Sequence, residues 1–197
     1  MKYGDVTFGQ MEAVLNKLGG EDGVSRFLAG ELVVKVAEKV FAPWMTIKLG
    51  TGLKDADAIR KAIADEGGRI SDWANDILGQ PAFTVATEET EVELVVVSVA
   101  ELGFKDGAKY SDICERAKQL GLALCPPEVG PQLRLQYKDQ PKGEWLRIAM
   151  EPITVSGGNL EVFLVEHDDD GLWLYSDDGL PGSFWYGFSR FVFVGRK

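Results

Sequence analysis

Histidine, cysteine and long apolar runs are scarce in this chain of 197 residues, and each scarcity excludes a class of protein. The one histidine, His167, excludes sites that need two, such as an HExxH zinc motif. The two cysteines, Cys114 and Cys125, are too few for the disulfide framework of a small secreted domain. The longest strongly apolar run, LVVVSVA, is too short to cross a bilayer, and the first residues lack the apolar stretch of a signal peptide. We therefore expect a soluble, cytoplasmic protein with no membrane partner.

Sequence motifs for catalysis or cofactor binding are missing too. The chain has no GxSxG elbow and no Walker lysine pattern. The GTG at 50–52 follows an expected strand and precedes an expected helix, as a dinucleotide-binding turn would. However, Asp55 stands where the third glycine of GxGxxG belongs, and its charge would repel a phosphate. We predict a plain strand–helix turn at 50–52 and no cofactor.

Positive charge is scarce relative to negative charge. The chain has 21 Lys and Arg against 31 Asp and Glu, which gives a net charge of −10. Residues 1–48 hold six of each, so the rest of the chain carries the whole imbalance. An acidic surface repels phosphate backbones, which argues against nucleic acid as a partner. Hydrophobic residues still make up 45% of the chain, enough for a globular core.

The first thirty residues favour a pair of helices. Thr7 and Gln10 form a capping-box pattern, and apolar residues follow at helical spacing as far as Gly19-Gly20. A second short helix is expected from Asp22 to Gly30. Two amphipathic helices joined in this way are expected to pack against each other.

Two helices joined by Gly-Gly also fit a DNA-binding helix-turn-helix. A recognition helix needs polar and basic side chains that face the groove. This one offers mainly Ser25 and Arg26, behind Glu21 and Asp22 at its start. Because these acids would face phosphates, the helical pair is better interpreted as a packing unit.

The middle of the chain mixes strands and helices. Strands are expected at 45–51 and 91–100, and helices begin near Asp55, Ser71 and Ser111. The second strand is apolar on both faces, which is typical of a central position in a sheet. Before these elements, the stretch ELVVKVAEKVFAPW fits strand or helix equally well.

From Leu122 onward the pattern changes to short period-two runs, namely LRLQY, EWLRIAM, NLEVFLVEH, GLWLYS and RFVFVGR. Such runs, separated by Gly, Pro and Asp, are typical of an antiparallel meander. The fold class is therefore α+β: an N-terminal helical pair, a mixed sheet with helices, and a C-terminal antiparallel meander. We place the boundary near Pro43, between a small helical region over 1–43 and an α+β domain over 44–197.

Several long strings resemble a group of uncharacterised bacterial proteins of unknown function. They are GELVV, RISDWANDIL, ELGFKDGA, LCPPEVGPQLRLQYKDQPKGEW and AMEPI, and they cover most of the chain. The resemblance implies a bacterial origin and a cytoplasmic setting. It implies no activity and no site residue.

The stretch EHDDDGLWLYSD, residues 166–177, most resembles a metal site. Aligned to a calcium loop, its acids fall near the ligand positions, with Gly171 at the glycine position. However, Glu166 stands where Asp is expected, and Asp177 stands where a bidentate Glu is needed. The flanking residues alternate with period two, so strands rather than helices enter and leave. We predict a hairpin turn closed by Gly171 in a left-handed conformation, and no metal site.

Cysteine–histidine catalysis would need His167 to meet Cys114 or Cys125 from a distant segment. Cys114 lies on the apolar face of an expected helix, which indicates an inert thiol, and Cys125 is expected in a more exposed place. Scattered groups such as Glu128, Asp168 and His167 leave open a hydrolase-type enzyme without a sequence motif.

Aromatic residues concentrate in the last part of the chain, above all in LPGSFWYGF. Four neighbouring rings cannot all face one side of a strand, so some are exposed or cover another surface. Exposed rings beside polar groups hold sugars, peptides and bases, because a rigid ring offers area at little entropic cost. The other interpretation is that these rings form the core of a small sheet. The candidate ligand or partner residues are Trp145, Arg147, Trp173, Tyr175, Trp185 and Tyr186.

Three functional hypotheses remain. The leading one is a non-enzymatic binding or regulatory protein that contacts a protein or small-molecule partner through its aromatic C-terminal surface. The alternatives are the hydrolase-type enzyme and a DNA-associated regulator or acidic DNA mimic. The sequence leaves the partner and the oligomeric state undetermined.

Overall fold

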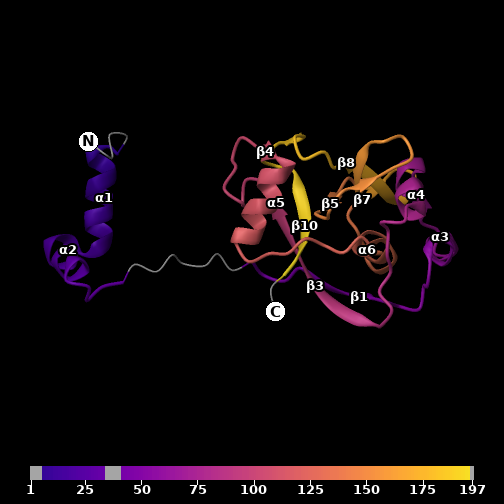
Figure 1. Ribbon diagram of the computed structural model, residues 1–197, viewed down its shortest axis with the longest axis horizontal. Helices are drawn as coiled ribbons and strands as arrows, with labels where there is room; N and C mark the ends of the chain where they lie inside the picture. Colours follow the sequence, from indigo (N-terminus) through magenta and orange to yellow (C-terminus); the bar gives the residue numbers. More distant parts are fainter. Residues whose placement is uncertain (1–5, 34–40, 196–197) are drawn as a thin grey trace. The chain divides into compact units, whose positions relative to one another are not determined.

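The computed structural model describes residues 6–33 and 41–195 (Figure 1). The chain divides into two compact units, Met1–Lys39 and Val40–Lys197, called here the N-terminal unit and the body. Each is described by itself. Half of the ambiguous stretch ELVVKVAEKVFAPW, residues 34–40, lies outside the described residues.

The N-terminal unit consists of two helices, α1 (Phe8–Leu18) and α2 (Gly20–Leu28). The predicted capping box is present, because the Thr7 side chain accepts from the Gln10 backbone while the Gln10 side chain accepts from the Thr7 backbone. Gly19 ends α1 in the left-handed region, at φ 97°. Local sequence signals therefore define both ends of α1.

Burial in the N-terminal unit is nearly absent. No residue of α1 is buried, and in α2 only Gly23 is. A Cβ on Gly23 would lie 1.6 Å from the carbonyl oxygen of Leu18, so the absence of a side chain lets α2 approach the end of α1 there. The exposed large apolar side chains of α1 and α2 are Phe8, Met11, Val14, Leu15, Phe27 and Leu28.

The body is built on a curled mixed sheet. Its strands are β1 (Met45–Leu49), β2 (Arg69–Ile70), β3 (Thr90–Ser98), β5 (Trp145–Ile148), β6 (Ile153–Thr154), β7 (Leu160–Asp168), β8 (Gly171–Asp178) and β10 (Arg190–Val194). They follow the order β1-β3-β10-β5-β7-β8-β2, and β6 pairs with β7. A separate two-stranded sheet joins β4 (Ala108–Lys109) and β9 (Phe184–Trp185).

Strand β10 joins the two halves of the main sheet. It is antiparallel to β3 and parallel to β5, while β5, β7 and β8 form the antiparallel C-terminal portion. The α+β class predicted from the sequence is therefore confirmed, including the antiparallel β7–β8 hairpin.

Four helices accompany the sheet in the body: α3 (Ala56–Asp65), α4 (Asp72–Gly79), α5 (Tyr110–Gln119) and α6 (Val129–Gln136). Ser71 caps α4 through its side chain, as predicted, and Asp55 caps α3 in the same way. Figure 1 shows α4 and α6 near β7 and β8, and α5 near β4 and β10, while α3 packs against α6 and β2. Among the described residues, no helix is long and apolar enough to cross a membrane.

The prediction of a strand at LRLQY is wrong, because most of these residues belong to α6. Val129 and Leu133, four residues apart, are both fully buried, which is helical spacing. Gly130 lets α6 approach the sheet, since a Cβ there would lie 2.6 Å from the ring of Phe163. A five-residue alternation is too short to exclude this helical arrangement.

The expectation that Cys125 is exposed is also wrong. Its side chain is 3% exposed, and its backbone NH donates to the carbonyl of Ala149 at 2.7 Å. Burial raises the pKa of the Cys125 thiol. Burial likewise raises the pKa of Cys114 to about 11, and its thiol is 9% exposed. Both thiols therefore belong to the core.

Candidate binding face on the C-terminal sheet

Side chains alternate along β5, β7 and β8, so cross-strand partners share one face of the sheet. In the first row, Trp145 lies opposite Glu166, and Glu166 lies opposite Trp173. On the other face, Leu146 pairs with Val165 and is fully buried. The register therefore places a carboxylate between two indole rings.

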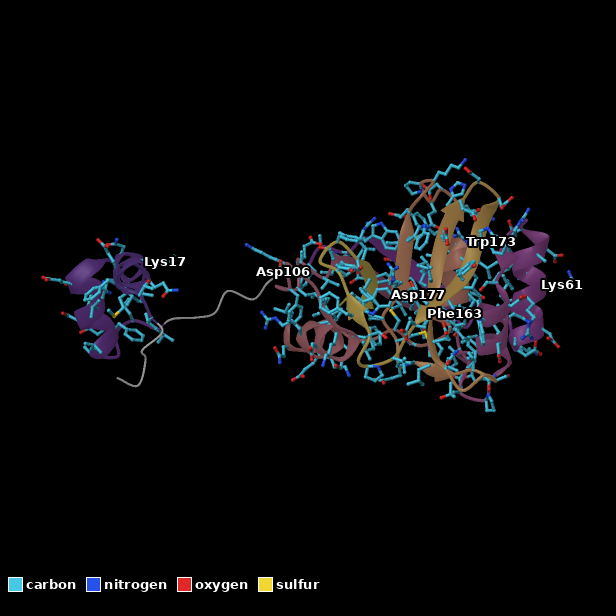
Figure 2. All side chains as sticks on the ribbon, turned by 90° about the horizontal axis from the view of Figure 1, so that it is seen from above. Lys17, Lys61, Asp106, Phe163, Trp173 and Asp177 are labelled. Atoms are coloured by element: carbon cyan, nitrogen blue, oxygen red, sulfur yellow. The ribbon has the colours of Figure 1, made fainter. Side chains whose placement is uncertain are left out.

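A second row on the same face runs from Arg147 to Leu164 and on to Tyr175. Trp145 is 48% exposed and Tyr175 is 42% exposed, while Leu164 beneath them is 2% exposed. We call the residues Trp145, Arg147, Glu166, Trp173 and Tyr175 the aromatic face. Figure 2 labels Trp173 on β8, in the half of the sheet that carries this face.

Trp173 is held in place by three neighbours. Its indole NH donates to Asp168 Oδ1 at 3.0 Å, and its ring meets Tyr175 edge-on with 5.9 Å between centroids. The guanidinium of Arg69 lies over the same indole, 5.3 Å from its centroid. These contacts fix the ring before any ligand arrives.

Arg147 is held as firmly. Its Nε donates to Asp177 Oδ2 at 2.8 Å, and the two side chains are 12% and 25% exposed. Its guanidinium also lies 4.4 Å from the ring centroid of Trp185, which packs edge-on against Phe191. The indole nitrogen of Trp185 is buried and has no hydrogen-bond partner among the described residues.

Glu166 is the unusual group of this face. It is 8% exposed, and its carboxylate has no hydrogen-bond or ion-pair partner in the described part of the chain. Burial raises its pKa above the ordinary 4.5, the charges of Asp168 and Asp177 raise it further, and Arg147 opposes the shift. Its carboxylate oxygens reach solvent rather than being sealed in the core, and an accessible carboxylate beside aromatic rings is a candidate for binding.

A groove of about 630 Å³ borders the face beside Trp145. Trp145, Arg147 and Phe188 line it together with the ion pair between Arg190 and Glu144, whose atoms lie 2.7 Å apart. The groove is therefore open enough to hold a small molecule or an extended segment.

A buried arginine supports the loop next to this groove. Arg134, 3% exposed, donates to Gln140 Oε1 at 2.5 Å and to the carbonyl of Tyr137. Gln140 in turn donates to the carbonyls of Glu144 and Val165. Burial lowers the pKa of Arg134 to about 10. This network fixes the loop that leads into Trp145.

Three exposed rings form a second aromatic feature, called here the aromatic ridge: Phe184, Tyr186 and Phe188. Tyr186 stacks on Phe188 with centroids 5.6 Å apart and planes inclined by 4°. Sequence reasoning selected Tyr186 and missed its two neighbours. Their spacing of two residues could have identified them, because along an extended chain it places their rings on one side and Trp185 on the other.

The six residues selected from the sequence are therefore distributed unequally. Trp145, Arg147, Trp173 and Tyr175 share the aromatic face, and Trp185 contacts it through Arg147. Tyr186 belongs to the aromatic ridge. The sequence did not identify Glu166 as their common neighbour, because the pairing depends on the register of three strands.

The acids considered for a hydrolase have separate structural partners. Glu128 is 1% exposed and accepts from the backbone NH groups of Gly50 and Ala86 at 2.8 and 2.7 Å. The hydrogen bond between Glu128 and the Gly50 NH secures the GTG turn. A Cβ on Gly50 would lie 2.1 Å from the carbonyl oxygen of Glu88. His167 Nδ1 contacts the carbonyl oxygen of Gln140 at 2.6 Å. Glu128 and His167 therefore serve different segments.

The aspartate-rich stretch forms the predicted hairpin turn. Strands β7 and β8 pair up to Asp168 opposite Gly171, and Gly171 has φ 122°. Asp168 Oδ1 accepts from the backbone NH of Asp170 at 2.8 Å, which stabilises the turn. Within the described residues, no group of three or more His, Cys, Asp and Glu side chains is arranged to hold a metal ion.

Comparison with known proteins adds no identity. No protein-family model, no curated protein and no solved structure matches this chain.

Proposed function

We propose that the body is a non-enzymatic binding protein that holds a partner against its aromatic face. The observation that carries this proposal is the combination of two exposed rings, Trp145 on β5 and Tyr175 on β8, with the unpaired carboxylate of Glu166 on the strand between them. Rings that are accessible, yet fixed by their neighbours, supply contact area at little entropic cost.

The supporting residues favour binding because they are already ordered. Trp173 is held by Asp168 and Arg69, and Arg147 is held by Asp177 and Trp185. A partner would therefore lose little free energy in ordering the site. The groove beside Trp145 extends the surface that a partner could contact.

Neither alternative function gains a specific observation. For the hydrolase, Glu128 is saturated by backbone donors, as described above. For the DNA-associated regulator, Arg26 of the N-terminal unit pairs with Glu31 at 3.5 Å, and Ser25 Oγ donates to the carbonyl of Glu21. These polar groups of α2 are engaged within their own unit.

The proposal is tested by following the indole NH signals of the five tryptophans by NMR during titration. The probes are Nα-acetyl-lysine amide, Nα-acetyl-norleucine amide and cellotetraose, which cover a cationic, an apolar and a sugar ligand. We expect at least one probe to shift the signals of Trp145 and Trp173, and Trp145→Ala to weaken its binding.

The matched control is Trp73→Ala, since Trp73 on α4 is 46% exposed, almost as much as Trp145. This variant should bind like the unmodified protein. If every probe leaves the Trp145 and Trp173 signals unchanged up to its solubility limit, the proposed function is wrong.

A further inference from the structure

We propose that the ligand of the aromatic face is a cation on an apolar stem, the lysine or arginine side chain of a peptide partner, with Glu166 as its counter-ion. This inference rests on the proposed function and gives it a ligand class. The cation would lie in the first row, between the rings of Trp145 and Trp173, which flank Glu166 on the neighbouring strands.

The first argument is an unbalanced charge. Three carboxylates belong to this face: Asp168 accepts from Trp173, Asp177 accepts from Arg147, and Glu166 has no donor among the described residues. Arg147 is committed to Asp177 and Trp185, so it leaves Glu166 without a direct partner. The oxygens of Glu166 are accessible from outside, so an ammonium or guanidinium group could provide the missing donor and compensate the charge.

The second argument is that the face already binds cations of its own. The guanidinium of Arg69 lies over Trp173, and that of Arg147 lies over Trp185. An indole ring attracts a cation through the negative potential of its face. Among the described residues, no cation lies over the ring of Trp145, which is 48% exposed. The face of this ring, which lines the groove, is therefore available to a cation of the ligand.

The third argument is the stem. A lysine or arginine side chain has an apolar stem that packs against aromatic surface while its head reaches a polar group. Trp145 and Tyr175 offer this surface, and the groove beside Trp145 has room for the peptide that carries the side chain. An anionic ligand would instead meet Glu166 and a chain of net charge −10.

The experiment compares two probes that differ only in the charged head. Nα-acetyl-lysine amide should bind with signals from Trp145 and Trp173, and Nα-acetyl-norleucine amide, of similar stem, should bind at least tenfold more weakly. Added salt should weaken the lysine probe, because screening acts on the charge pair.

Glu166→Gln should weaken the lysine probe at least tenfold, since the amide keeps the shape and removes the charge. The matched control is Glu161→Gln, on the same strand but at an odd position, where the side chain points to the opposite face. Glu161→Gln should change the affinity less than twofold. Thermal unfolding of both variants verifies that they are folded.

The outcomes separate the two proposals. If cellotetraose or the norleucine probe binds at Trp145 as tightly as the lysine probe, or if Glu166→Gln leaves lysine binding unchanged, the cation inference fails and the binding function stands. If no probe affects the two tryptophans, the binding function itself fails.

Discussion

The two units of this chain use their apolar residues in opposite ways. In the N-terminal unit, α1 has a complete capping box and a glycine C-cap, yet Phe8 is 89% exposed and no α1 residue is buried. In the body, Phe163, Phe191 and Phe193 are fully buried. A sequence can therefore define the ends of a helix without burying the apolar side chains of that helix.

The physical reason is that helix signals are local, whereas burial requires partners. A cap satisfies backbone NH groups within a few residues, but most helical stability in proteins comes from packing of the apolar side. A unit of fewer than about 40 residues rarely buries enough surface to be stable alone. We therefore expect packing within the body to supply most of the free energy of unfolding.

The largest loss of stability, and so the strongest test of this comparison, is expected from a cavity in the body. Phe163→Ala should cost about 3–5 kcal/mol, because Phe163 is fully buried against Gly130 of α6 and 6.1 Å from the ring of Phe83. Denaturant unfolding measures the loss. Phe188→Ala, at an 80% exposed ring, is the control and should cost less than about 0.5 kcal/mol. Equal costs would contradict the assignment of the core.

An intermediate effect is expected under the aromatic face. Arg147→Ala should destabilise the body by about 2 kcal/mol, because Asp177 loses its partner and Trp185 loses the stacked guanidinium. Urea unfolding gives the value. Lys61→Ala removes an ion pair with Asp65 between side chains that are 75% and 61% exposed, and it should be nearly neutral. A neutral Arg147→Ala would mean that the face is not ordered by this pair.

Glu166→Gln should have a smaller effect, of opposite sign. The folded body raises the pKa of Glu166 above 4.5, so the ionised form destabilises it at neutral pH, and the amide should raise the free energy of unfolding there by less than about 1 kcal/mol, because solvent screens part of the effect. The gain should shrink as pH falls through the raised pKa and vanish below 4.5, where both states protonate the carboxyl. Unfolding at several pH values measures it. A destabilised variant at pH 7 would show that Arg147 already neutralises this carboxylate.

The smallest effect is expected from removal of the N-terminal unit. A chain that starts at Val40 should retain the melting temperature of the full protein to within about 1 °C, because the body has its own core and no residue of α1 is buried within its own unit. Calorimetry compares the two chains. A fall of several degrees would mean that the apolar surface of α1 is buried in the full protein.

Local patterns predicted much of this fold. The caps at Thr7, Asp55 and Ser71 and the turn at Gly171 follow from side chains within a few residues of each other. The failure at α6 has the same origin, because Leu133 alternates with its neighbours and also lies four residues from Val129. The packing of α6 against the sheet, as where Gly130 meets Phe163 thirty-odd residues away, is absent from that local pattern.

The aromatic face was predictable only in part. Alternation in EWLRIAM and GLWLYS placed Trp145 with Arg147 and Trp173 with Tyr175. The position of Glu166 between them depends on the register of β5 against β7, which no local pattern contains. In the sequence, Glu166 looked like the first acid of a turn rather than the centre of a face.

The place of β10 has a consequence for how the body is assembled. Its residues Arg190–Val194 lie between β3 and β5. Until β10 has paired, the two halves of the main sheet are therefore not joined through it. Pairings between segments so distant along the chain form slowly. Phe191 of β10 packs edge-on against Trp185, whose ring lies against the guanidinium of Arg147, so the order of this part of the surface depends on the pairing of β10.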